Sequence, residues 1–144
     1  MRKEIILNGG WRFHKGDIAE PVSQDKGFIY SQSKTERKLS GPAAYNYPDT
    51  PDSYGGGMIN PEKWVWTDLP HDYVVYQDNS ENENCALGYL HYDNAWYRKH
   101  FDMPEGSENR RALLRFDGIA GKSTVYLNGC LMYHNFSAYN TFEI

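Results

Sequence analysis

Residues 123–133 read Ser-Thr-Val-Tyr-Leu-Asn-Gly-Cys-Leu-Met-Tyr, and this stretch decides the fold class. Its centre, Asn128-Gly129, is the strongest short signal for a two-residue β-hairpin turn, because both residue types tolerate a positive φ. Apolar and polar side chains alternate before the turn, as in a half-buried strand. The stretch therefore predicts a hairpin. Its two strands are Ser123–Leu127 and Cys130–Tyr133.

Similar short extended runs recur along the chain and are separated by Gly, Pro and Asn turns. No segment of ten residues has the 3.6-residue period of an amphipathic helix, and no internal repeat is present. Short strands spaced by 8–12 residues are typical of a β-sandwich or a jelly roll, so we predict an all-β jelly-roll sandwich. The further runs are Glu4–Leu7, Trp11–His14, Trp64–Leu69, Tyr73–Tyr76, Trp96–Phe101, Ala112–Phe116 and Asn140–Ile144.

Residues 15–63 differ from the rest of the chain, because they are rich in Gly, Pro and polar residues and lack a regular period. We predict a long irregular excursion within a single domain that spans residues 1–144. The chain stops at Ile144, within a predicted strand. Since an unpaired edge strand is a liability that proteins avoid, we expect the last strands of the sandwich to lie beyond this residue.

Composition excludes several classes of protein. The chain has 144 residues, enough for one ordinary domain, and a net charge of −4 with no basic run, which argues against binding to nucleic acid. Its apolar runs are too short to span a membrane. No apolar signal-peptide core follows Arg2 and Lys3, so we expect a cytoplasmic protein. Cys85 and Cys130 have no CxxC partner; a disulfide between them is one alternative, but a reducing cytosol favours two thiols.

The sequence identifies no catalytic residue, metal site or cofactor site. A glycosidase needs two carboxylates that face one bond, and sequence alone selects no such pair among 19 acidic residues. The five histidines form neither HxH nor HExxH, and the chain has no GxSxG, P-loop or GxGxxG motif.

Aromatic residues are the main chemical signal: the chain has 12 Tyr, 6 Phe and 4 Trp. Aromatic rings bind sugar faces, but they also dominate small cores, and we expect the tryptophans at 11, 64, 66 and 96 to lie in the core. Residues 69–73, Leu-Pro-His-Asp-Tyr, place an imidazole and a carboxylate at the end of a strand. This segment indicates either a site on a stiff support or a turn capped by its aspartate.

Five blocks resemble, in order, the N-terminal blocks of glycoside hydrolase family 2, which includes β-galactosidases, β-glucuronidases and β-mannosidases. Together they cover the chain except residues 15–63. The blocks are Asn8–Phe13, similar to LNGxWxF; Trp66–Tyr73, similar to W…LPHDW; Ala95–Phe101, similar to WYRKxF; Phe116–Gly129, similar to FDG…VYLNG; and Ala138–Ile144, similar to YxPFEFDIT.

The resemblance implies the galactose-binding-like, sugar-binding domain of a retaining β-glycosidase, most nearly a β-galactosidase. In that family an immunoglobulin-like sandwich and a barrel with the catalytic glutamates follow, so we expect residues 1–144 alone to be inactive. The resemblance places Asp72 at the position that hydrogen-bonds the sugar, with His71 and Tyr73 as weaker neighbours. Tyr73 stands where the family usually has Trp.

The expected partners are a β-glycoside or oligosaccharide substrate and the following domains of the same chain. The resemblance allows Mg²⁺ or Na⁺, and an oligomer, in a longer parent protein. Two other functions remain open: a free-standing carbohydrate-binding module without catalysis, and a purely structural or interaction domain.

Overall fold

The computed structural model describes residues 3–18, 43, 54–55, 58–59 and 64–144. The chain divides into two compact units, and each of them is described by itself below. The first unit comprises Met1–Ile18 and Pro48–Phe101, and the second comprises Ala19–Tyr47 and Asp102–Ile144.

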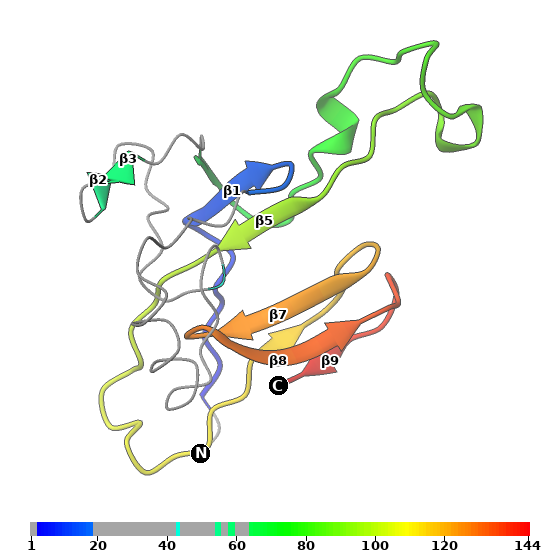
Figure 1. The fold of residues 1–144 in the computed structure, drawn as a ribbon. Helices are drawn as coiled ribbons and strands as arrows, with labels where there is room; N and C mark the ends of the chain where they lie inside the picture. The colour runs from blue at the N-terminus through cyan, green and yellow to red at the C-terminus, as the bar shows by residue number, and fades with distance from the viewer. Residues whose placement is uncertain (1–2, 19–42, 44–53, 56–57, 60–63) are drawn as a thin grey trace, which may run out of the picture. The chain divides into compact units, whose positions relative to one another are not determined.

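A three-stranded antiparallel sheet forms the centre of the first unit (Figure 1). Strand β1 (Trp11–Lys15) lies between β4 (Val65–Thr67) and β5 (Ala95–Arg98). Successive side chains of a strand point to opposite faces, so Phe13 and His14 are buried on different sides of the sheet. The predicted runs at 11–14, 64–69 and 96–101 therefore contain strands, shorter or shifted by a few residues.

The four tryptophans are buried to very different degrees. Trp64 is 1% exposed, which confirms its predicted place in the core, and its ring lies 5.6 Å from that of His14. Trp66, by contrast, is 57% exposed, so its predicted burial is wrong. It lies on the edge strand β4, where the Arg12 guanidinium stacks 4.6 Å from the ring centre and covers part of it. Trp11 and Trp96 are half-buried.

The predicted strand Tyr73–Tyr76 is wrong, because this segment is the 3-10 helix η2 (Val74–Tyr76). The Asp72 side chain accepts a hydrogen bond from the Val74 backbone N–H at 2.9 Å and so turns the chain before a strand can form. One local capping hydrogen bond thus outweighs the strand propensity of the β-branched residues.

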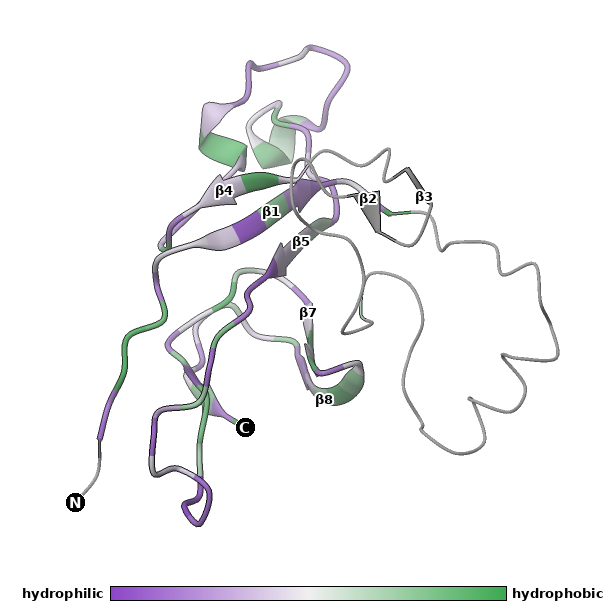
Figure 2. Ribbon diagram, turned by 90° about the vertical axis from the view of Figure 1, so that its left-hand side faces the viewer, coloured by the Kyte–Doolittle hydropathy of each residue, from purple (hydrophilic) through white to green (hydrophobic). Residues whose placement is uncertain are grey.

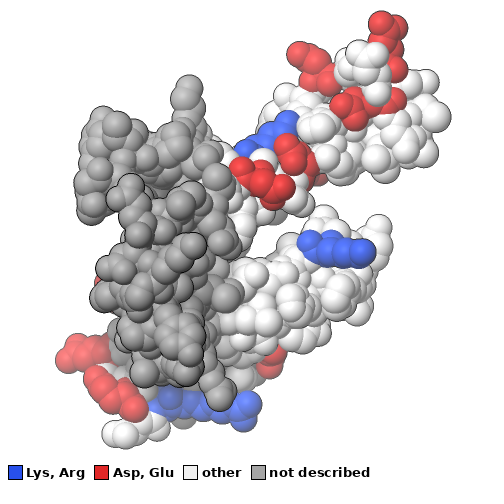
Figure 3. Space-filling model, viewed as in Figure 1, with Lys and Arg blue, Asp and Glu red and all other residues white. Residues whose placement is uncertain are grey.

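Residues 77–94, called the arm below, project from the sheet of the first unit (Figure 1). The 3-10 helix η3 (Cys85–Leu87) lies in the arm. Ser80 N–H donates to the Tyr89 carbonyl at 2.9 Å, which holds the two sides of the arm together. Carboxylate side chains gather over the arm in Figure 3. The acidic residues of the arm are Asp78, Glu81, Glu83 and Asp93.

One other prediction about the first unit needs correction. The run Glu4–Leu7 is not a strand: Ile6 is 83% exposed, and the run pairs with no other strand among the residues described. Within residues 15–63, where an irregular excursion is predicted, β2 (Tyr54–Gly55) pairs with β3 (Met58–Ile59). The rest of the excursion lies outside the described residues, apart from residues 15–18 and 43.

In the described residues of the second unit, the strands form two pairs. The predicted hairpin is confirmed, since β7 (Ser123–Leu127) pairs with β8 (Cys130–Asn135) around Asn128 and Gly129, whose φ angles are 50° and 80°. Strand β6 (Arg115–Phe116) pairs with β9 (Phe142–Glu143), within the runs predicted at 112–116 and 140–144. The buried Phe142 ring stacks on those of Phe116 and Tyr133, at 4.9 and 4.8 Å.

The all-β prediction is confirmed by the residues described, whose regular structure consists of short strands and single-turn 3-10 helices. Hydrophobic segments are short and alternate with hydrophilic ones along the ribbon (Figure 2). Across the described part of the chain, we find no helix long and apolar enough to span a membrane.

Candidate functional site

The segment Leu69–Tyr73, called the site turn below, connects β4 to η2 in the first unit. Its Leu69–Pro70 peptide is cis. Two hydrogen bonds connect the entry of the turn to the segment before β1: Leu69 N–H donates to the Asn8 carbonyl at 2.8 Å, and Gly10 N–H donates to the Asp68 side chain, at Oδ1, at 2.7 Å. The site turn is therefore held close to the start of the central strand, β1.

Asp72 is exposed at the tip of the site turn. Its Oδ1 atom caps η2, so one of the two interpretations of this segment, a turn capped by its aspartate, is confirmed. A carboxylate can accept several hydrogen bonds, and that cap is the only one Asp72 accepts from the described residues. Capping therefore leaves Oδ2 open to a ligand hydroxyl. The role of Asp72 in binding a sugar stays a prediction.

Four aromatic rings, two from the site turn and two from the sheet, pack together, and we call them the aromatic cluster. Phe13 is its centre: its ring centroid lies 4.8 Å from that of His71, 5.1 Å from that of Tyr97 and 5.5 Å from that of Tyr73. Phe13 and Tyr97 are register partners across β1 and β5. The paired strands β1 and β5 thus support His71 and Tyr73 through the ring of Phe13.

The hydroxyl of Tyr73 is engaged with the base of the arm. It donates to the Asp93 carbonyl and accepts from the Asp93 backbone N–H, at 3.3 Å. Lys15 lies 5.8 Å from the centre of the Tyr73 ring and also hydrogen-bonds Gln77. The structure therefore shows Tyr73 as an anchor between the site turn and the arm, and its contact with substrate stays a prediction.

Tyr97 is the site residue that sequence reasoning missed. Its hydroxyl oxygen lies 2.8 Å from His71 Nδ1, and the two rings meet edge to face at 5.7 Å. Burial raises the pKa of Tyr97 to about 12, with smaller contributions from Tyr73 and from the negative charge of Asp72. The Tyr97 hydroxyl therefore stays protonated well above neutral pH. Tyr97 lies on a predicted strand, but only the pairing of β5 with β1 brings it to the turn.

The raised pKa of Tyr97 predicts a loss of stability at high pH. An unfolded tyrosine ionises near pH 10, whereas folded Tyr97 ionises near pH 12, so folding opposes ionisation. This contribution to stability is complete below pH 10 and disappears as the pH rises from 10 through 12. We expect the urea midpoint to fall across this range, and to fall less steeply in Tyr97→Phe. An equally steep decline in both proteins would contradict the assignment.

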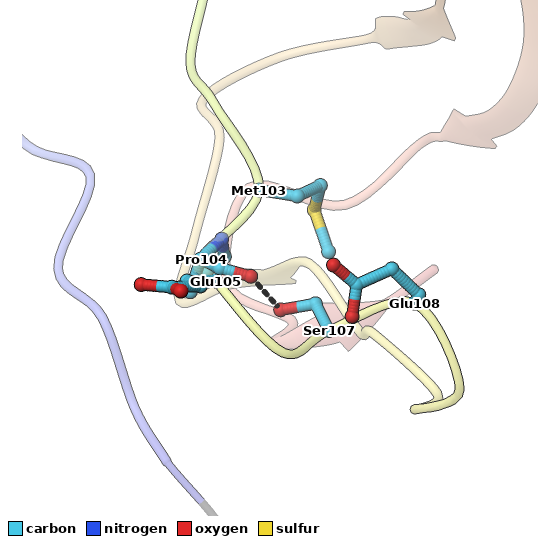
Figure 4. Close-up of a pocket in the computed structure, with 5 residues that line it drawn as sticks. All are labelled: Met103, Pro104, Glu105, Ser107 and Glu108. Atoms are coloured by element: carbon cyan, nitrogen blue, oxygen red, sulfur yellow. Dashed lines mark hydrogen bonds between the residues drawn. The ribbon is translucent and has the colours of Figure 1, made fainter.

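We find no comparable site elsewhere among the described residues. In the second unit, Met103, Pro104, Glu105, Ser107 and Glu108 line an open hollow of about 180 Å³, where the Ser107 hydroxyl donates to the Pro104 carbonyl at 2.5 Å (Figure 4). It holds two carboxylates and no aromatic ring. Within the described residues, no group of three or more His, Cys, Asp or Glu side chains could hold a metal ion.

Comparison with known proteins agrees with the four sequence blocks that lie within residues 61–144. The family model for the glycosyl hydrolase 2 galactose-binding domain-like family matches residues 61–144, which include the site turn, β5 and the hairpin. A β-galactosidase from Bacteroides ovatus is 32% identical over 68 residues, which are 46% of this chain and 8% of that protein. A putative β-glucuronidase from Formosa agariphila is 26% identical over 83 residues, 56% of this chain and 8% of that protein.

A second β-glucuronidase from Formosa agariphila is 26% identical over 73 residues, which are 49% of this chain and 7% of that protein. The chain thus corresponds to only a small part of these relatives. No solved structure matches it significantly. Since the family model covers more than half of the chain, the chain belongs to the glycosyl hydrolase 2 galactose-binding domain-like family.

Proposed function

We propose that this chain is the sugar-binding domain of a longer, retaining β-glycosidase, most nearly a β-galactosidase, that hydrolyses O-glycosidic bonds in carbohydrates. The family match over residues 61–144 carries the proposal. The similar proteins from Bacteroides ovatus and Formosa agariphila, named as β-galactosidase and β-glucuronidases, support a glycoside substrate. In this proposal the catalytic glutamates belong to other domains of the longer protein.

The site turn would contribute to the substrate pocket through Asp72. Its exposed carboxylate would accept hydrogen bonds from sugar hydroxyls and so orient the ring toward the catalytic groups. Such a contact raises the rate only if it is stronger in the transition state than in the ground state. Hydrogen bonds to sugar hydroxyls that strengthen during glycoside hydrolysis have this property. The hydrogen bonds at the entry of the turn and the packing of the aromatic cluster support this role, because they limit the movement of the turn.

Activity assays of two proteins test the proposal. The full-length protein that contains this chain should hydrolyse nitrophenyl β-galactoside, with β-glucuronide and β-mannoside as alternative substrates. The 144-residue chain, prepared in the same way, should give no turnover with any of them. Turnover by the isolated chain would refute the assignment of the catalytic glutamates to other domains. Inactivity of the full-length protein toward all three glycosides would refute the glycosidase function.

A carbohydrate-binding module without catalysis is the second candidate, and the exposure of Trp66 favours it. This ring is 57% exposed and is held in place by the Arg12 guanidinium, as a platform for a sugar face would be. Titration calorimetry of the 144-residue chain with galacto-oligosaccharides separates the two candidates. Submillimolar affinity that is lost in Trp66→Ala, combined with an inactive full-length protein, would establish the binding module.

A further inference from the structure

The direction of the hydrogen bond between Tyr97 and His71 depends on which ring nitrogen of His71 carries the proton. The half-buried Tyr97 hydroxyl is protonated, and Nδ1 of His71 is its only hydrogen-bond partner among the described residues. A hydroxyl that leaves the solvent needs an acceptor for its proton, and Nδ1 is the acceptor within reach. These contacts favour a bond in which the Tyr97 oxygen carries the proton and Nδ1 is unprotonated.

A neutral imidazole carries its proton on one nitrogen only, so an unprotonated Nδ1 places that proton on Nε2. Nε2 of His71 has no hydrogen-bond partner within the described part of the chain and is not one of its buried, unsatisfied atoms. His71 is held in place by Phe13, whose ring lies 4.8 Å away and is nearly perpendicular, at 65°. The neighbours that contact the His71 ring, Phe13 and Tyr97, thus come from β1 and β5.

We propose that Tyr97 is a positioning residue that fixes His71 as the Nε2–H tautomer, so that the site turn presents an N–H donor next to the carboxylate of Asp72. Adjacent residues then offer one donor and one acceptor. In the proposed function, His71 would donate to one sugar hydroxyl and Asp72 would accept from a neighbouring one. The choice of a sugar as ligand rests on the proposed function, whereas the tautomer does not.

Nitrogen NMR of the full-length protein with ¹⁵N-labelled histidine tests the tautomer directly. At a pH about two units above the ordinary imidazole pKa, His71 should show a protonated Nε2 and an unprotonated Nδ1. The signal is assigned by its absence in His71→Gln. In Tyr97→Phe, which keeps the ring but removes the hydroxyl, the His71 shifts should move toward a mixture of tautomers. The control is Tyr92→Phe, on a 53% exposed tyrosine of the arm, which should leave them unchanged.

A proton on Nδ1 in the wild-type protein, or identical His71 shifts in wild type and Tyr97→Phe, would overturn the proposal. Kinetics then test the ligand. We expect Tyr97→Phe to lower kcat/KM for the β-galactoside about 5-fold, and to have no further effect in a His71→Ala background.

Failure of the proposed ligand contact of His71 and failure of the proposed function give different results. If Asp72→Asn lowers kcat/KM while Tyr97→Phe changes only the NMR spectrum, the ligand contact of His71 is refuted and the proposed function stands. If neither variant changes the kinetics, the proposed role of the site turn fails and the tautomer assignment remains.

Discussion

Replacement of Asp72 by alanine in the full-length protein is expected to lower kcat/KM for an aryl β-galactoside by about 100-fold. A hydrogen bond to a charged acceptor is worth about 1.5–3 kcal/mol, and a contact made mainly in the transition state appears in kcat as well as in kcat/KM. The exposed carboxylate is available for such a contact, because its only described hydrogen bond is the one from Val74. Steady-state kinetics with nitrophenyl β-galactoside measure the loss.

Alanine also removes the cap of η2, so a second variant must separate the two roles of Asp72. Asparagine retains a side-chain oxygen for the Val74 N–H but lacks the charge. If the carboxylate contacts the substrate, Asp72→Asn should keep the urea midpoint of the wild type and still lose most of the kcat/KM. Asp78→Ala, on an exposed aspartate of the arm, is the matched control and should be unaffected. Wild-type kinetics in Asp72→Asn would show that Asp72 acts only as the cap of η2.

Local signals in the sequence predicted the hairpin and the all-β class well, because both depend on near neighbours. Asn128 and Gly129 can adopt positive φ angles, and strand alternation extends from them on both sides. The prediction failed where a single hydrogen bond outweighed propensity, as at Tyr73–Tyr76, which the Asp72 cap turns into a 3-10 helix. It failed again at Trp66, since its residue type says nothing about a place on an edge strand.

The candidate site was predictable only as far as it is continuous in sequence. The order Leu-Pro-His-Asp-Tyr marked the site turn, but Tyr97 is 26 positions from His71 and reaches it through the register of β5 on β1. That register follows from which residues share a face of the sheet, and a one-residue slip would move Tyr97 to the other face. The partner that orients His71 was therefore visible only in three dimensions.

The second large effect is expected from Phe13→Ala, which should lower the free energy of unfolding of the 144-residue chain by about 3–5 kcal/mol. Phe13 is 8% exposed and contacts three rings of the site, so its removal leaves a cavity at the point where the sheet supports the turn. The cost exceeds the loss of one contact, because His71, Tyr73 and Tyr97 all lose their shared neighbour. Urea unfolding followed by tryptophan fluorescence measures it, with an unchanged m value as the condition for comparison.

Tyr76→Ala is the matched control, because this aromatic residue of the same unit is 83% exposed and should cost no more than about 0.5 kcal/mol. Phe13→Leu, which fills most of the volume, should cost less than about 1.5 kcal/mol. Equal losses for alanine at positions 13 and 76 would mean that the aromatic cluster does not support the fold. If the cluster does hold the site turn, Phe13→Leu in the full-length protein should lower kcat/KM more than its small cost in stability explains, since the leucine side chain lacks the flat ring against which His71 packs.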